Sequence, residues 1–296
     1  MYRSKMPDGF SSFHPIVNMM YFMIVLLCTM FSMHPVLICI SCACGTGYLL
    51  YLKGGKSILK SFKYMSVMMT MVIIINPLFN HEGATILYYM DNGNPITKES
   101  IIYGVFMALL LITVINWCGC YNTVMDSDKF IYLFGTIIPH LSLILSMTLR
   151  YVPRFKVQFR KVREAREAMG GNISKGNIIR RIRNFADIIS VMISWSLENS
   201  IETSDSMRSR GYGMKGRTSF SIYRFSRRDG IVCGVLLSCI SVVMYGVLSE
   251  NMYYRYYPTF EKGLFEVKML VIYVVYGVMC LIPLIINNME KCKKKT

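Results

Sequence analysis

The sequence is poor in charged residues, which make up 17% of its 296 positions, whereas a typical soluble domain carries about a quarter. Acidic residues are the scarcer kind, with 17 Asp and Glu against 33 Lys and Arg. A helix crosses a bilayer with roughly 17–25 mostly apolar residues, so long stretches without charge predict a polytopic membrane protein. That prediction excludes soluble enzymes, secreted disulfide scaffolds and DNA-binding domains. The charge-free stretches are residues 9–52, 64–80, 100–125, 130–149, 231–249 and 269–289.

Motifs for nucleotide hydrolysis, metal binding and nucleophilic catalysis are also missing. Residues 54–57 resemble the end of a phosphate-binding loop, but Leu50 stands where that loop requires glycine. The sequence contains neither H-E-x-x-H nor G-x-S-x-G. The cysteine pairs at 42–44 and 118–120 have neither a second pair nor a histidine at ligand spacing. We therefore expect no catalytic site, no metal site and no cofactor.

The charge-free stretches predict six membrane-spanning helices. The first stretch is too long for one crossing, and Pro35 near its middle favours the start of a second helix. The fold class expected is therefore an all-α polytopic membrane protein. Its regions are a four-helix membrane region (1–121), a cytoplasmic insert (122–228), and membrane helices with a basic tail (229–296). The predicted spans are residues 16–33, 35–52, 64–80, 100–121, 230–249 and 268–288.

The distribution of basic residues predicts the orientation of these spans. Short loops rich in Lys and Arg stay in the cytoplasm, which places the lysines of residues 53–63 and of residues 291–295 on that side. Both termini are then cytoplasmic. The apolar stretch 130–149 cannot make a single crossing under this rule, because the strongly basic segment 150–166 follows it directly. We expect that stretch to lie along the inner face of the membrane or to dip into it.

The cytoplasmic insert is predicted to contain two long helices. The first runs over residues 152–169 and ends at Gly170, and the second runs over residues 178–210, as one helix or two, and ends at Gly211. Glycine just past a helix end is a common stop signal. The apolar segment 187–197 is too short and too closely flanked by charge to span, so it is expected to pack against membrane helices or a partner.

Helix spacing predicts which arginines of the insert remain available to a partner, because ions three or four residues apart pair on a helix surface. Arg166 and Arg210 have no carboxylate at those offsets, and each lies in a last helical turn. Such cations could instead complement the helix dipole or contact anionic lipid. The pairs expected within one helix are Arg160 with Glu164, Arg163 with Glu167, and Arg208 with Asp205.

Residues 205–213, Asp-Ser-Met-Arg-Ser-Arg-Gly-Tyr-Gly, resemble the second arginine-containing signature of the transmembrane T component of energy-coupling factor (ECF) transporters. Residues 142–154 resemble the stretch that enters the coupling helices of that family, and residues 216–229 resemble the return to the membrane. Residues 12–18 resemble the opening of one branch of the family. The resemblance covers nearly the whole chain.

The resemblance implies a non-catalytic scaffold in a prokaryotic cell membrane. The family's partners are two cytoplasmic ABC-type ATPases, which bind the coupling helices, and a membrane S component that captures a vitamin or a Ni or Co ion; the lipid bilayer surrounds the chain, and no nucleic acid is involved. In the first motif, Met169 stands where the family has arginine, and Arg166 lies one turn earlier. The implied ATPase-binding residues are Arg210, Ser209, Gly211 and Arg208, with Arg166 and Arg163 from the first motif.

Two alternatives remain open from the sequence. A stand-alone secondary carrier or channel would need charged or broken helices at a midplane site, for which Asn76-Pro77 is the one hint. A membrane-embedded enzyme would need clustered carboxylates or histidines at the membrane face. We expect the membrane region to lack the buried charges of a proton relay or voltage sensor.

Overall fold

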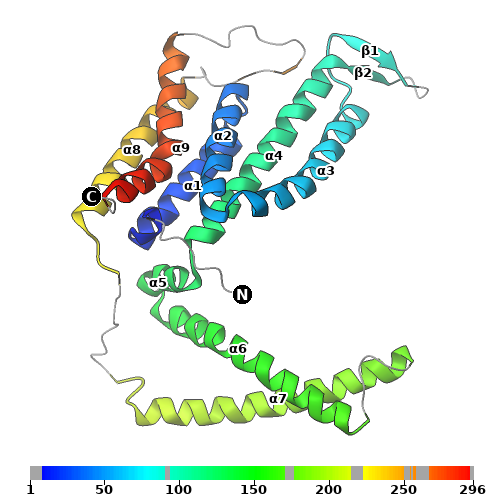
Figure 1. Ribbon diagram of the computed structural model, residues 1–296, viewed down its shortest axis with the longest axis vertical. Coiled ribbons are helices and arrows are strands. Elements are labelled where there is room, and N and C mark those ends of the chain that lie inside the picture. The colour runs from blue at the N-terminus through cyan, green and yellow to red at the C-terminus, as the bar shows by residue number, and fades with distance from the viewer. Residues whose placement is uncertain are drawn as a thin grey trace. The chain divides into compact units, whose positions relative to one another are not determined.

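A computed structural model describes residues 9–90, 94–170, 177–214, 223–249, 254, 256–257 and 267–293 (Figure 1). The chain forms two compact units. The membrane unit consists of Met1–Phe130 with Tyr223–Thr296, and the insert unit consists of Ile131–Ile222. Each unit is described on its own below.

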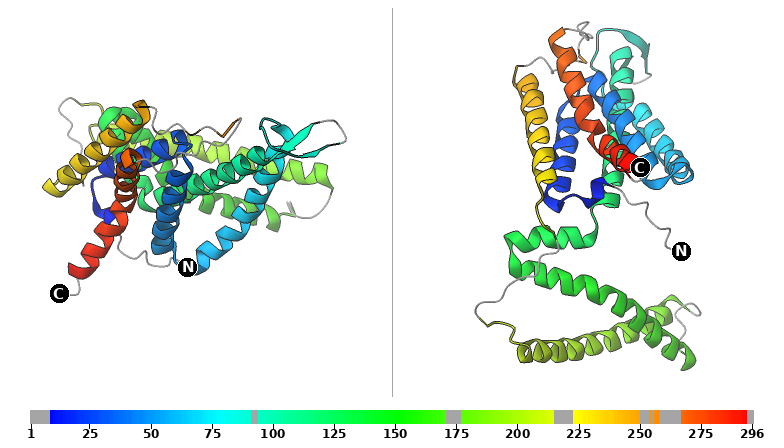
Figure 2. Two further views of the ribbon diagram at one scale, coloured as in Figure 1. Left: turned by 90° about the horizontal axis from the view of Figure 1, so that it is seen from above. Right: turned by 60° about the vertical axis from the view of Figure 1, so that its left-hand side comes forward.

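The membrane unit is built from long apolar helices, which confirms the all-α polytopic fold. Among the described residues, five helices are long and apolar enough to cross a membrane, and α1 is a shorter apolar helix. α3 lies along α4, and α8 lies along α9 (Figure 2). The elements are η1 Phe10–Ser12, α1 Pro15–Phe31, α2 Pro35–Lys53, α3 Gly55–Phe79, β1 Ile86–Tyr89, β2 Pro95–Thr97, α4 Lys98–Val124, α8 Arg227–Leu248 and α9 Val267–Lys293.

Helix starts follow the sequence signals closely. α1 and α2 each begin with a proline, and His14 and His34 are their N-caps. Proline suits this position because its missing N–H would have no helical partner. Burial lowers the pKa of both histidines, so both rings are neutral at pH 7. The predicted span began at residue 64, whereas α3 begins at Gly55. The lysine-rich connection between the second and third spans is therefore part of the helix.

The core of the membrane unit contains a buried network of polar side chains. Trp117 of α4 donates its indole N–H to Ser41 of α2 at 2.9 Å. The hydroxyl of Thr29 on α1 lies 3.0 Å from that of Ser41 and 2.8 Å from that of Tyr276 on α9. All four residues are buried. The network therefore links four helices through polar groups that satisfy one another, as buried polar groups must.

Residues 9–14 form hydrogen bonds with the ends of several helices of the membrane unit. Two of the contacted residues, Lys129 and Asp229, lie close in sequence to the boundaries of the insert unit. The backbone N–H of Phe10 donates to Asn287 of α9 at 3.1 Å. Lys129, in the first turn of α5 Ser127–Ile137, donates its ammonium to the carbonyls of Ser11 and Val124. The N–H of His14 donates to the carboxylate of Asp229 at 3.0 Å.

Three charged residues are buried at helix starts of the membrane unit. Glu99, Lys129 and Asp229 are 2%, 5% and 4% exposed. Each is among the first three residues of a helix, where hydrogen bonds to the backbone and hydroxyls hold it. Glu99 accepts from the Thr85 hydroxyl at 2.6 Å and so anchors the β1–β2 hairpin, a pair of short antiparallel strands that the sequence patterns did not predict.

The insert unit consists mainly of α6 Pro139–Ala168 and α7 Ile178–Ser209. The apolar stretch 130–149 is not one spanning helix, since α5 ends at Ile137 and α6 begins with Pro139 as its first residue. α6 therefore starts thirteen positions before the predicted 152 and contains Pro153 inside the helix. α7 agrees closely with its prediction and is a single helix of 32 residues.

Candidate functional site

The two long helices of the insert cross in an antiparallel pair. The rings of Phe155 on α6 and Trp195 on α7 meet edge to face, with centroids 5.3 Å apart. The hydroxyls of Tyr151 and Thr203 are 2.7 Å apart. Ile188 and Met192 are buried. The pair thus has a narrow apolar core, with a polar contact between the middle of α6 and the last third of α7.

The C-terminus of α7 has a complete Schellman motif. Gly211 has a φ of 78°, its N–H donates to the carbonyl of Arg208 at 3.0 Å, and the N–H of Tyr212 donates to the carbonyl of Met207 at 3.1 Å. These two bonds satisfy carbonyls that the helix end would otherwise leave unpaired. The motif fixes Arg210 as the residue that caps the helix. The predicted stop at Gly211 is confirmed.

Arg210 is exposed on this helix end. Within the described part of the chain, no carboxylate pairs with it. Ser209 donates its hydroxyl to the carbonyl of Ser206 at 2.9 Å, which is a local bond of the last turn. Arg208 is exposed as well, and its predicted pair with Asp205 is not formed among the described residues. Two cations at this end therefore have no ion pair with any residue that the structure describes.

The C-terminus of α6 repeats the geometry of α7 with a different residue at the cap. Met169 is the C-cap, and Gly170 has a φ of 87° and donates its N–H to the carbonyl of Glu167 at 3.1 Å. Met169 therefore occupies on α6 the structural position that Arg210 occupies on α7. Its side chain is 72% exposed, so this end presents a thioether where the other presents a guanidinium.

Two arginines of α6 pair with carboxylates in the described part of the chain. Arg163 pairs with Glu167 at 2.9 Å, as its spacing predicts. Arg166 pairs with Asp187 of α7, a contact between helices that spacing within one helix cannot reveal. Among the described residues Arg160 has no ion pair, so its predicted pairing with Glu164 does not occur. Arg166 thus ties the two helices together instead of standing free.

The two glycine-capped ends lie at opposite ends of the helix pair. Arg166, in the last turn of α6, meets Asp187 near the start of α7, whereas Thr203, near the end of α7, meets Tyr151. With a rise of 1.5 Å per residue, the stretch of α7 from Asp187 to its end separates them by roughly 30 Å. The two glycine-capped helix ends are therefore well separated within the insert unit.

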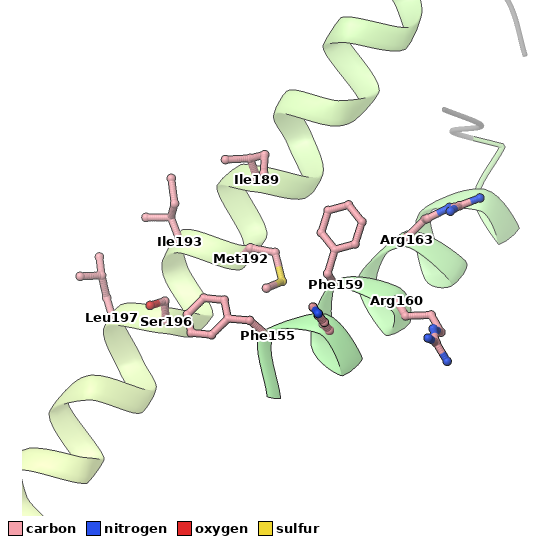
Figure 3. Close-up of a pocket in the computed structure, with 10 residues that line it drawn as sticks. Phe155, Phe159, Arg160, Arg163, Ile189, Met192, Ile193, Ser196 and Leu197 are labelled. Carbon is pink, nitrogen blue, oxygen red and sulfur yellow. The ribbon is translucent and has the colours of Figure 1, made fainter. Parts of the chain in front are cut away.

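A cavity of about 680 Å³ opens between α6 and α7 (Figure 3). Its floor is apolar and includes Phe155, Phe159 and Ile193. Lys156, Arg160 and Arg163 of α6 also line it, and no carboxylate does. In Figure 3 the guanidinium groups of Arg160 and Arg163 extend outward from α6. Elsewhere, the described residues contain no group of three His, Cys, Asp or Glu side chains placed to hold a metal ion.

The family model described as CbiQ, cobalt transport protein, matches residues 12–220. The chain belongs to this family. The match begins in the N-terminal segment that joins the helix ends and extends through the whole α6–α7 pair.

Curated relatives carry the name energy-coupling factor transporter transmembrane protein EcfT. The protein from Brevibacillus brevis is 26% identical over 200 residues, which cover 64% of this chain and 74% of the relative. The protein from Lacticaseibacillus paracasei is 25% identical over 205 residues, covering 65% and 77%. A shorter match to the Lactobacillus helveticus protein covers 49% of this chain and 56% of that one. This member of the CbiQ family is therefore a transmembrane component of an ECF transporter.

Proposed function

We propose that the chain couples ATP hydrolysis by two cytoplasmic ABC-type ATPase subunits to the uptake of a micronutrient. In this proposal a separate membrane S component captures the solute, which is a vitamin or a Ni or Co ion. The chain itself is a non-catalytic scaffold in the bacterial cell membrane, with both termini and the insert unit in the cytoplasm. The basic residues at 53–63 and in the insert support this orientation.

Arg210 carries the proposal. It is exposed, it has no ion-pair partner among the described residues, and the Schellman motif fixes its backbone. A guanidinium in this setting is prepared for a two-point bond with a carboxylate of an ATPase groove. Removing one partner of such a buried interfacial pair costs about 2–5 kcal/mol. Arg208, Ser209 and Gly211 complete this attachment point in the proposal.

The second attachment point is the end of α6. Its geometry matches that of α7, and its distance from the first suits one ATPase subunit at each helix end. Because Arg166 is already paired with Asp187 and Arg163 with Glu167, we assign these two arginines a weaker part in binding. The cap residue Met169 makes this attachment apolar, so the ends of α6 and α7 would contribute unequally to the free energy of ATPase binding.

Charge reversal at Arg210 tests the proposal. We expect Arg210→Glu to reduce co-purification of the ATPases at least tenfold and to abolish ATP-dependent uptake, since a loss of 2–5 kcal/mol corresponds to a much larger change in affinity. Lys161→Glu is the matched control, because Lys161 is an exposed cation of α6 away from both helix ends. Unchanged co-purification and uptake in Arg210→Glu would refute the proposed role.

Reconstitution of the purified chain separates this function from a stand-alone carrier or channel. The chain alone is expected to give no solute flux in proteoliposomes, with flux appearing once the ATPases, the S component and ATP are present. Flux without these partners would identify a carrier or channel and overturn the scaffold proposal.

A further inference from the structure

The insert unit is connected to the membrane unit by two short stretches of chain. The entry link (residues 125–130) follows α4, and the exit link (residues 223–229) leads into the first turn of α8. All residues of both links belong to the membrane unit. A movement of the insert reaches the membrane helices along the chain only through these two links.

One segment of the membrane unit binds both links. In the N-terminal clamp (residues 9–14), the carbonyl and the hydroxyl of Ser11 accept the ammonium of Lys129, in the entry link, at 2.5 Å and 2.9 Å. The backbone N–H of His14 donates to the carboxylate of Asp229, in the exit link, at 3.0 Å. Two stretches that lie far apart in the sequence are thus held by one short segment.

The two charges that bind the N-terminal clamp also close helix ends. The ammonium of Lys129 donates to the carbonyl of Val124 at 2.9 Å, at the C-terminus of α4, and the carboxylate of Asp229 forms the capping box of α8 with Ser226. The helix dipole favours a cation at a C-terminus and an anion at an N-terminus. Lys129 and Asp229 are buried, and a buried charge that loses its hydrogen bonds is costly. Each link is therefore held to the clamp by a charge that is fixed in place.

The N-terminal clamp is anchored in the core of the membrane unit. The ring of Phe10 is fully buried, and its centroid lies 5.1 Å from that of Tyr21 and 6.2 Å from that of Phe22. The N–H of Phe10 donates to Asn287 of α9 at 3.1 Å. Both links are therefore tied to the same buried anchor.

The links also lie close to each other. Burial raises the pKa of Tyr223, in the exit link, and the negative charges of Asp128 and Asp126, in the entry link, raise it further. The effect of a single charge fades beyond about 10 Å at 0.1 M salt, so these groups are neighbours. Neighbouring links with a shared anchor are suited to move together.

We propose that the N-terminal clamp couples the two links, so that a displacement of the insert at either link moves both links together. Lys129 and Asp229 are then positioning residues, which pass a movement of the insert to α1 and α9 as one step. Two independent links would instead let the insert move without displacing these helices. The transmission role rests on the proposed function, whereas the coupling between the links does not depend on it.

Hydrogen exchange in the full chain, purified in detergent, tests this coupling without any partner. Both links contain hydrogen-bonded amides, such as those of Phe130 and Ser226, so mass spectrometry of peptides from each link reports its opening. Lys129→Met keeps an unbranched side chain but removes its bonds to the N-terminal clamp. We expect it to speed exchange at least fivefold in the exit link, which it does not alter. Asp229→Ala should likewise speed exchange in the entry link.

Two control variants change the same helix ends without removing a bond to the N-terminal clamp. Ser226→Ala breaks the capping box of α8 but leaves the bond between Asp229 and His14, so exchange should rise in the exit link alone. Thr123→Val removes a hydroxyl that donates to the carbonyl of Gly119 within α4 at 2.8 Å, so exchange in the exit link should stay unchanged.

A change in the anchor should affect both links at once. Phe10→Ala removes the buried ring of the N-terminal clamp and is expected to speed exchange in the entry and exit links together. Asn287→Ala removes the acceptor of the Phe10 N–H. It should give a smaller rise in both links, and it replaces the Phe10 variant if that chain does not fold.

The transmission role is tested on the complex with the ATPases that co-purify with the chain. The non-hydrolysable nucleotide AMP-PNP should change exchange in both links of the intact chain in the same direction. In Lys129→Met, whose ATPases should still co-purify, the responses of the two links should differ by at least threefold. Arg210→Glu is expected to lose the ATPases themselves, so failure of the proposed function and failure of this inference give different results.

Faster exchange confined to the substituted link, or an equal effect of Ser226→Ala and Asp229→Ala on the entry link, would overturn the coupling. The first result would make the links independent, and the second would assign their connection to the end of α8 instead of the N-terminal clamp. Equal responses of the two links to AMP-PNP in Lys129→Met, or no response in the intact complex, would overturn the transmission role.

Discussion

The two tryptophans of the chain lie one in each unit, and they show how differently the units are stabilised. Trp117 is fully buried in the membrane unit, donates a hydrogen bond to Ser41 and packs edge to face against Tyr21 and Phe22. Trp195 in the insert unit is half-buried and makes one edge-to-face contact with Phe155. The membrane-unit tryptophan is therefore fixed by several buried partners, whereas the tryptophan of the insert has a single aromatic neighbour among the described residues.

Charged residues also differ in their surroundings between the two units. In the membrane unit, Glu99 and Asp229 are buried and hydrogen-bonded at helix starts. In the insert, Arg208 and Arg210 are exposed at a helix end. The charges of these helix starts are therefore bonded within the membrane unit, whereas the two arginines at the end of α7 have no ion pair among the described residues.

Truncation of the two tryptophans should give very different losses of stability. Trp117→Ala removes a buried ring and the partner of Ser41, so we expect a loss of about 3–5 kcal/mol. Trp195→Ala should cost about 1 kcal/mol or less, because its ring is only half-buried. Thermal unfolding of the membrane unit can be followed with a thiol-reactive dye, since Cys44, Cys120 and Cys280 are buried, and unfolding of the insert unit, which contains no cysteine, can be followed by proteolysis at increasing temperature. Equal shifts of the unfolding midpoint in the two variants would contradict the expected difference between the two tryptophans.

Removal of the Asp229 carboxylate should come next in size. Asp229 accepts from the N–H and the hydroxyl of Ser226 and from the N–H of His14, so Asp229→Ala loses a capping box and a link to α1. We expect a loss of about 1–2 kcal/mol in the same dye assay. Asp229→Asn keeps an acceptor oxygen and is the control; a loss as large as that of the alanine variant would show that the negative charge is what matters.

Glycine substitutions should act in opposite directions in the two units. Gly211 has a φ of 78°, so Gly211→Ala should destabilise the end of α7 by about 1–2 kcal/mol and speed proteolysis near residue 211. Gly234 lies inside α8 with nothing within 4 Å of an added Cβ, so Gly234→Ala should stabilise the membrane unit by about 0.5–1 kcal/mol. Stabilisation by Gly211→Ala together with destabilisation by Gly234→Ala would contradict the backbone conformations described for these two glycines.

The ion pair between α6 and α7 should have the smallest effect. Side chains of Arg166 and Asp187 are 36% and 43% exposed, so solvent weakens their attraction to about 0.5–1 kcal/mol. A double-mutant cycle with Arg166→Ala and Asp187→Ala, read from proteolysis of the insert, measures this coupling. The pair of Arg163 and Glu167 within α6 is the control, with about 0.3–0.5 kcal/mol expected. A coupling near zero for both would mean that packing alone holds the helix pair.

The sequence predicted the helices well because their signals are local. Proline marks the starts of α1 and α2, and glycine marks the ends of α6 and α7. The start of α6 was placed too late, because the apolar stretch 130–149 was treated as a separate segment along the membrane, whereas its second half is continuous with the charged stretch in one helix. The hairpin between α3 and α4 escaped prediction because its strands have three and four residues.

Contacts between distant segments could not be predicted in this way. Spacing within one helix found the pair of Arg163 and Glu167, but it could not place Asp187 beside Arg166, because that contact depends on how α6 and α7 cross. For the same reason the buried positions of Lys129 and Asp229, which contact residues 9–14, had no local signal. Arg210 was predictable because the same local signals, a helix end and a missing carboxylate, define it.

The placement of the cysteines has a practical consequence for experiments on the living transporter. All ten thiols of the sequence lie outside residues 131–222. A single cysteine introduced at Met169 or Arg210 would therefore be the sole thiol of the insert unit. A crosslink in whole cells that appears in this variant and not in the unaltered chain would come from the introduced thiol and identify the molecule that touches that helix end, while every native cysteine stays in the membrane unit.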